Sequence, residues 1–97
     1  MAQIIWTEPA LQELDEIADY ISLDKPDAAR RLVRKVFERV GRLRSHHLMG
    51  KLVHELETDI YRWLSVPPCK IFYRTEAGLV FIIHIIRDKQ MFHPDIL

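Results

Sequence analysis

The chain has 97 residues, with 14 basic and 14 acidic side chains and a formal net charge of zero. Its 48% apolar and 29% charged composition is that of an ordinary globular protein, and its length suits one domain, residues 1–97, with a modest core. No stretch reaches the roughly 18 uninterrupted apolar residues of a membrane span, and residues 1–10 show no secretion signal. The lone Cys69 excludes an internal disulfide and fits a reducing compartment, so we expect a cytoplasmic protein.

The charges are sorted along the chain. Residues 8–24 hold six acids and no base, whereas residues 30–51 hold eight bases and only one acid, Glu38. This asymmetry has two interpretations: an anionic partner, or two neighbouring helices of opposite sign that pair with each other. The second is the simpler use of the pattern.

The first half of the chain predicts a strand followed by two helices. A short apolar strand is expected at 3–6, and Thr7 is placed to cap a helix that ends near Leu23, because Lys25 precedes a proline. The apolar positions of this helix recur at helical spacing: Ala10, Leu14, Ile17, Ala18 and Ile21. A second helix begins around Pro26, and its apolar face comprises Ala29, Leu32, Val33, Val36, Phe37, Val40 and Leu43. The short connection predicts an antiparallel helical hairpin.

The second half predicts a loop and three strands. We expect a loop over 45–58, with a short strand near 53–56. Residues 59–66 and 70–75 have the aromatic and β-branched content and the period of two that are typical of strands, and the Pro67–Pro68 pair forces a turn between them. The period puts Leu64 and Trp63, and likewise Ile71 and Phe72, on opposite faces. Glu76-Ala77-Gly78 predicts a hairpin turn with Gly78 at positive φ, leading into an apolar strand at 79–86 that is central or covered on both faces. The fold class is therefore α+β, in the order β-α-α-β-β-β, with a helical hairpin packed on a mostly antiparallel sheet.

The C-terminal tail, residues 88–97, is rich in apolar side chains for its length. Such surface either packs back onto the domain or awaits a partner. The apolar residues of the tail are Met91, Phe92, Ile96 and Leu97.

This order of elements, together with several local segments, resembles the RelE/ParE superfamily of bacterial toxins from toxin–antitoxin pairs, and most closely its ParE-like branch. The segments that carry the resemblance are ALQELDEIADYI (10–21), PDAA (26–29), MGKLVHEL (49–56), Tyr61-Arg62 and Ile71-Phe72-Tyr73-Arg74. The resemblance implies a growth-inhibiting toxin neutralised by a cognate antitoxin. ParE-type members poison DNA gyrase by binding, without a hydrolytic site, whereas RelE-type members cut messenger RNA on the ribosome.

The RelE-type pattern falls on three residues of this chain: Lys70, Arg87 and His93. Cleavage by a 2′-hydroxyl needs a proton acceptor, cations for the developing charge and a proton donor. Glu55 is a candidate base in the loop, and Arg62 and Arg74 are candidate target- or phosphate-binding residues. Lys70 stands where RelE-type enzymes often carry arginine, which alone has the bidentate fork suited to phosphate. His93 stands in for the C-terminal tyrosine of some nucleases, because no tyrosine follows Tyr73.

Each candidate also has a purely structural interpretation. Arg62 and Arg74 are equally read as residues of a solvated strand face or as partners of the acidic helix. His84, inside an apolar strand, predicts a hydrogen-bonded core histidine, and Cys69 predicts an inert thiol. The strand aromatics are more typical of packing than of base stacking; they are Tyr61, Trp63, Phe72 and Tyr73. His46, His47 and His54 lack metal-ligand spacing, so we expect no metal and no cofactor.

The sequence therefore favours a ParE-like toxin that binds gyrase. A RelE-like ribosome-dependent endoribonuclease is the alternative, and a degenerate member that keeps only antitoxin binding is a third possibility. We expect the antitoxin to dock on the 91–97 tail and in the groove beside the helical hairpin, with an acidic segment neutralising the arginine-rich face.

Overall fold

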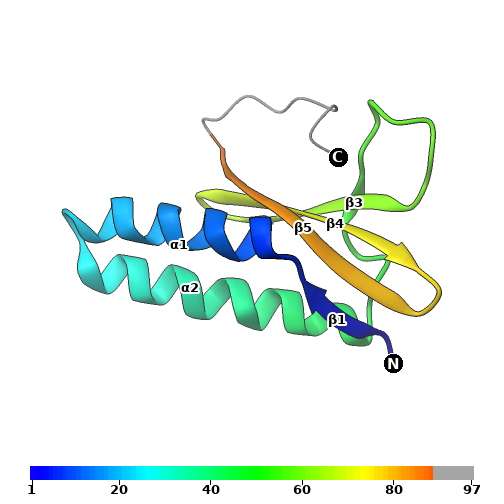
Figure 1. Ribbon diagram of the computed structural model, residues 1–97, viewed down its shortest axis with the longest axis horizontal. Helices are drawn as coiled ribbons and strands as arrows, with labels where there is room; N and C mark the ends of the chain where they lie inside the picture. Colours follow the sequence, from blue (N-terminus) through cyan, green and yellow to red (C-terminus); the bar gives the residue numbers. More distant parts are fainter. Residues whose placement is uncertain (89–97) are drawn as a thin grey trace.

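The computed structural model describes residues 1–88 of the chain (Figure 1). Its elements follow the order β1 (Gln3–Trp6), α1 (Glu8–Ser22), α2 (Pro26–Gly41), a short 3₁₀ helix (Arg42–Arg44), β2 (Lys51–Leu52), β3 (Tyr61–Val66), β4 (Cys69–Glu76) and β5 (Leu79–Arg87). The two helices run antiparallel and cover one face of the sheet, as Figure 1 shows. The predicted β-α-α-β-β-β order is confirmed, with one additional two-residue strand, β2.

The five strands form one sheet in the order β1-β5-β4-β3-β2. β1 pairs with β5 in parallel, and all other neighbours are antiparallel, so the expectation of a mostly antiparallel sheet is confirmed. β5 lies between β1 and β4, which accounts for its nearly continuous apolar sequence. The β4–β5 turn places Ala77 at φ 50° and Gly78 at φ 78°, so Gly78 takes the positive φ that the sequence predicts.

The main core lies between the helices and the sheet. Strand alternation directs one side-chain set of each strand into it: Leu64 and Val66 from β3, and Ile71 and Tyr73 from β4. The helices add their apolar stripes, which include the buried residues Ala10, Leu14, Ile17, Leu32, Val36 and Val40. Each fully buried aliphatic side chain of this kind contributes roughly 1.5–3 kcal/mol to folding, so this interface holds the helical hairpin on the sheet.

Phe37 departs from the expected core position. It belongs to the apolar stripe of α2, yet it is 44% exposed. Its ring packs against Trp6 at the end of β1, with ring centroids 4.7 Å apart. The apolar stripe of α2 is therefore wider than the surface that it buries against the sheet, and Phe37, at the margin of the stripe, covers β1 at the edge of the sheet.

Two local predictions differ from the structure in part. Thr7 occupies the N-cap position of α1 but makes no capping bond; its hydroxyl donates instead to the carbonyl oxygen of Ile82 at 2.6 Å. The first turn of α1 contains Pro9, which has no N–H to be capped. The short strand expected near 53–56 lies at β2 (Lys51–Leu52) instead, because β3 pairs there and the chain turns away at Val53. Within residues 1–88, no helix is both long and apolar enough to cross a membrane.

Candidate functional site

The sheet face turned away from the helices carries cations beside aromatic rings. Register places Lys51 opposite Trp63, and Lys70 pairs with Ser65, two residues further along β3. Both lysine ammonium groups lie 5.2 Å from the centroid of the Trp63 ring, within the range of a cation–π contact. The candidate residue Lys70 therefore stands on the open face, next to a second cation.

Arg74 extends the same face toward the β4–β5 turn. It lies between Tyr61 and Phe81 in the register, and its guanidinium carbon is 4.2 Å from the centroid of the Phe81 ring. Arg74 also forms an ion pair with Glu76. A second, smaller core supports this face, comprising Val53, Phe72 and Ile86 with half-buried Leu56, Tyr61, Trp63 and Ile83 around them. Of the four strand aromatics, Phe72 and Tyr73 are buried, whereas Tyr61 and Trp63 are half-buried.

Arg62 lies on the other face of the sheet, opposite Tyr73 in the register. One of its terminal nitrogens donates to the carbonyl oxygens of Leu48 at 3.1 Å and Gly50 at 3.0 Å. Its Nε is buried without a hydrogen-bond partner among the described residues. The structure thus separates Arg62 from Arg74 and gives Arg62 a direct part in holding the 48–50 loop.

Tyr73 fastens the same loop from the centre of the sheet. Its hydroxyl accepts a hydrogen bond from the Gly50 N–H and donates one to the His47 carbonyl oxygen, both at 2.9 Å. Tyr73 has no exposed surface, and burial raises the pKa of its phenol above the ordinary value, with the Gly50 bond opposing the shift. The hydroxyl therefore stays protonated and keeps both bonds.

The structure places two of the RelE-type candidates, Lys70 and Arg87, on opposite faces of the sheet. Arg87 pairs with Cys69, and its guanidinium carbon lies 4.7 Å from the ring centroid of Tyr20 on α1, so Arg87 is on the helix side. Lys70 follows Cys69 and points to the opposite side. Glu55 is exposed in the loop between β2 and β3. His93 and the tail residues Met91, Phe92, Ile96 and Leu97 lie outside the described residues.

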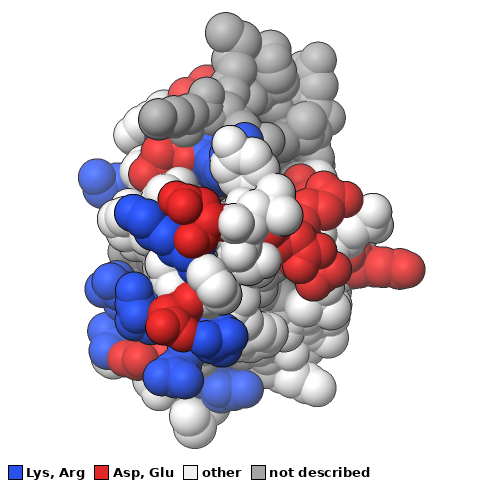
Figure 2. All heavy atoms as spheres, turned by 90° about the vertical axis from the view of Figure 1, so that its left-hand side faces the viewer, with Lys and Arg blue, Asp and Glu red and all other residues white. Residues whose placement is uncertain are grey.

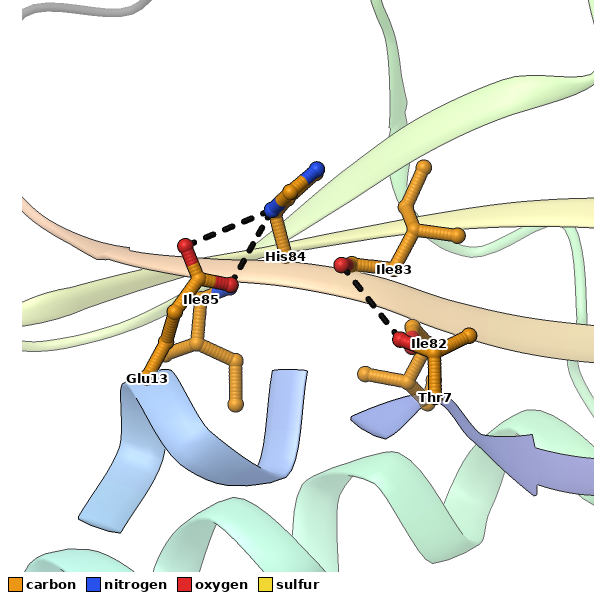
Figure 3. Close-up of polar contacts among 6 residues, drawn as sticks. All are labelled: Thr7, Glu13, Ile82, Ile83, His84 and Ile85. Atoms are coloured by element: carbon orange, nitrogen blue, oxygen red, sulfur yellow. Dashed lines mark hydrogen bonds and ion pairs between the residues drawn. The ribbon is translucent and has the colours of Figure 1, made fainter. Parts of the chain in front are cut away.

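A polar group that sequence reasoning missed closes the edge of β5 beyond the end of β1 (Figure 3). Glu13 of α1 accepts a hydrogen bond from the Ile85 N–H at 3.2 Å and lies 3.0 Å from Nδ1 of His84. The Glu13 carboxylate thus replaces the strand partner that Ile85 lacks after β1 ends. The expectation that His84 is hydrogen-bonded is confirmed, although its side chain is half-buried rather than fully enclosed.

The environment of Cys69 disfavours a reactive thiolate. Cys69 is fully buried, and burial raises the pKa of its thiol to about 11, with Asp88 adding to the shift and Arg87 opposing it. Because the thiolate is the reactive form, burial and the raised pKa both favour the inert thiol that the sequence predicts. Residues 1–88 contain no cluster of three or more His, Cys, Asp or Glu side chains suited to a metal ion.

The two helices do not pair through their charges. Within residues 1–88, the ion pairs of α2 and the following 3₁₀ turn join Arg30 to Asp27 and Arg42 to Glu38, both inside this segment. Figure 2 shows Lys and Arg gathered on one side, with some Asp and Glu among them, whereas the other side carries Asp and Glu alone. The simpler interpretation of the charge pattern, a pairing between the helices, is therefore wrong, because the two charged faces point in different directions.

The fold and these surfaces define a small α+β domain of the kind found in bacterial toxins. A family model described as the ParE toxin of type II toxin–antitoxin system, parDE, matches residues 4–92. The chain therefore belongs to the ParE toxin family, within the RelE/ParE superfamily.

Individual relatives agree with this assignment. The chain is 34% identical to Toxin RelE2 of Caulobacter vibrioides over 85 residues, which cover 88% of this chain and 93% of that protein. It is 43% identical over 49 residues to the putative toxin Y4kP of Sinorhizobium fredii, covering 50% and 51% of the two chains. A chain of the chromosomal ParDE toxin–antitoxin system from P. aeruginosa superposes with a TM-score of 0.75 at 26% identity, covering 90% of this chain and 96% of that one. Membership of a type II toxin family implies a cognate antitoxin as partner.

Proposed function

We propose that this toxin stops growth by binding and poisoning DNA gyrase in the cytoplasm, and that its cognate antitoxin reverses the effect. The observation that carries the proposal is the ParE family match over residues 4–92. The separation of Lys70 and Arg87 onto opposite faces of the sheet supports it, because a nuclease site needs its cations around one phosphate.

The test uses purified full-length toxin in gyrase supercoiling reactions. We expect loss of supercoiling and accumulation of gyrase-linked cleaved DNA. Unchanged supercoiling together with no covalent gyrase–DNA complex would refute the proposal.

The target-binding role of Arg74 can be examined separately from that of Arg62. Arg74 sits on the open face, so Arg74→Gln should weaken gyrase inhibition while leaving the fold intact. An Arg62→Gln variant would also release the carbonyl oxygens of Leu48 and Gly50, which makes it a poor probe of binding. Arg30→Gln on α2 is the matched control, since Arg30 is a surface arginine with a single carboxylate partner, Asp27.

A ribosome-dependent endoribonuclease is the second candidate. It is favoured by the name of the relative Toxin RelE2 and by the cation pair of Lys51 and Lys70 on the open face. Primer extension on translated messages should then show codon-positioned cuts that Lys70→Ala, Arg87→Ala and His93→Ala each reduce. Intact messages during growth arrest would remove this candidate. If expression without any antitoxin is harmless, the third possibility stands instead, a member that retains only antitoxin binding.

We further propose that the antitoxin docks on the apolar tail and in a groove beside the helical hairpin. The groove has a volume of about 450 Å³ and lies between α1 and α2; its lining includes Ala18, Ala29 and Val33. An incoming amphipathic helix or strand would supply the missing burial. Deleting residues 91–97 should weaken antitoxin affinity, and unchanged affinity would exclude the tail from the interface.

A further inference from the structure

The outer side of α2 carries a concentration of positive charge that the rest of the molecule leaves unpaired. Residues 26–44 contain seven basic and two acidic side chains. Both of these acids, Asp27 and Glu38, are already engaged by Arg30 and Arg42. Since the net charge of the chain is zero, any attraction of this protein for a polyanion must come from a local surface such as this one.

Four cations of α2 remain, which we call the α2 basic row: Arg31, Arg34, Lys35 and Arg39. Arg31, Arg34 and Lys35 are exposed and Arg39 is half-buried. Within residues 1–88, none of the four takes part in an ion pair or a side-chain hydrogen bond. Figure 2 shows the corresponding gathering of Lys and Arg on one side of the hairpin.

The geometry of the row suits a regularly charged rod. Arg31, Lys35 and Arg39 follow one another at four-residue spacing, so they stand about 6 Å apart along the helix and span about 12 Å. Duplex DNA carries one negative charge per roughly 1.7 Å of axis, which gives about seven phosphates over that distance. Three guanidinium groups among the four cations favour phosphate further, because their planar fork matches phosphate oxygens.

The acidic antitoxin segment that we expect from the sequence on this arginine-rich face fits it less well than DNA does. Protein interfaces are anchored by buried aromatic or aliphatic side chains; of the basic residues, arginine is enriched in them and lysine is depleted. Anchors of this kind are scarce near the row: among the described residues, the only exposed large apolar side chain of α2 is Phe37. Phe37, which is on α2, points to the other side and packs on Trp6.

We infer that the α2 basic row binds the phosphate backbone of duplex DNA without sequence preference. This activity is separate from gyrase poisoning and does not depend on gyrase being the target. Contacts to phosphate position a protein on the duplex but read no sequence, and phosphate is the group that this spacing of charges matches.

Salt dependence measures the number of phosphates contacted. The full-length toxin would be titrated against a fluorescent 24-base-pair duplex between 50 and 200 mM salt. Four contacts predict a slope of about −3.6 in log K against log salt, which is an affinity loss of about 150-fold over this range. An Arg31→Gln/Lys35→Gln variant should retain a slope of about −1.8, or a loss of about 12-fold. Both positions are exposed and glutamine is a good helix former, so its circular dichroism should match the parent.

The matched control also removes two positive charges, but from the opposite side of the molecule. Lys51→Gln/Lys70→Gln alters the open face of the sheet and should leave the slope near that of the parent. An equal effect of the two double variants would show that only net charge matters and would overturn the inference, as would no measurable duplex binding at 50 mM salt.

Two competitor molecules test whether the α2 basic row prefers a ligand other than duplex DNA. Poly-glutamate of the same total charge should displace the duplex poorly; equal competition would assign the row to an acidic protein segment. A single-stranded oligonucleotide of the same length should bind more weakly than the duplex. Tighter binding of the single strand, unaffected by the α2 variant, would place nucleic acid on another surface and overturn the inference.

Discussion

Removing a single oxygen atom at the centre of the sheet should loosen the loop that precedes β2. The Tyr73 hydroxyl makes two hydrogen bonds of 2.9 Å, one from the Gly50 N–H and one to the His47 carbonyl oxygen. Each is worth about 0.5–1.5 kcal/mol, and an unpaired buried N–H costs about 1–3 kcal/mol. Since Tyr73 and Gly50 are both buried, we expect Tyr73→Phe to lower the free energy of unfolding by about 2 kcal/mol. For a domain of this size that is a fall of roughly 8–16 °C in Tm.

Urea unfolding followed by tryptophan fluorescence measures this loss. The midpoint should fall while the m-value stays unchanged, because the denatured state is not altered. Tyr20→Phe is the matched control: Tyr20 is 62% exposed, so removing its hydroxyl should change stability by less than about 0.5 kcal/mol. If the two variants were equally stable, the hydroxyl of Tyr73 would not be what fastens the loop.

Three further predictions concern Gly50, Cys69 and Glu13. Gly50→Ala should cost about 1–3 kcal/mol in the urea assay, because a Cβ there would lie 2.5 Å from the Tyr73 hydroxyl oxygen and 2.9 Å from the Trp63 carbonyl oxygen; parent-like stability would show that the loop yields freely. The pKa of Cys69 is raised in the folded state from 9.0 to about 11. The protonated thiol therefore contributes fully to the free energy of unfolding below pH 9, and this contribution, at most roughly 2.7 kcal/mol, is lost as the pH rises to 11. Cys69→Ala should flatten the stability curve between pH 9 and 10, and an identical slope in both proteins would contradict this. Glu13→Ala should speed amide hydrogen exchange at Ile85, whereas Glu13→Gln, which keeps an acceptor oxygen, should do so less; equal exchange in all three proteins would rule out the edge-closing role.

Much of the fold follows from local patterns in the sequence. The period of two in β3 and β4 places Leu64 opposite in direction to Trp63, and Ile71 opposite to Phe72, and the structure confirms that each pair is divided between the two faces. The apolar stripes define both helices for the same reason, because their period of 3.6 is imposed by burial against the sheet. These features are predictable since each depends on neighbours within a few residues.

The features that sequence reasoning missed depend on contacts between distant segments. Glu13 looks like one more solvated acid on α1, and only the end of β1 at Trp6 leaves the Ile85 N–H for it to accept. Arg62 lies in an alternating strand and gives no local sign that it will bind carbonyl oxygens 12 and 14 residues away. In both cases the partner is a backbone group freed by the tertiary arrangement.

The same alternation that makes the sheet predictable constrains what the toxin can do. Lys70 and Arg87 are close in the register, since Arg87 pairs with the residue before Lys70. Closeness in register does not bring them to one phosphate, because successive side chains point to opposite faces of the sheet. Arg87 lies beside Tyr20 of α1, whereas Lys70 lies beside Trp63 on the opposite face, and both cations are half-buried. A reaction that used both cations at one phosphate would require Arg87 to leave Tyr20 and reach the other face of the sheet, which is the geometric reason for the binding mechanism that we propose.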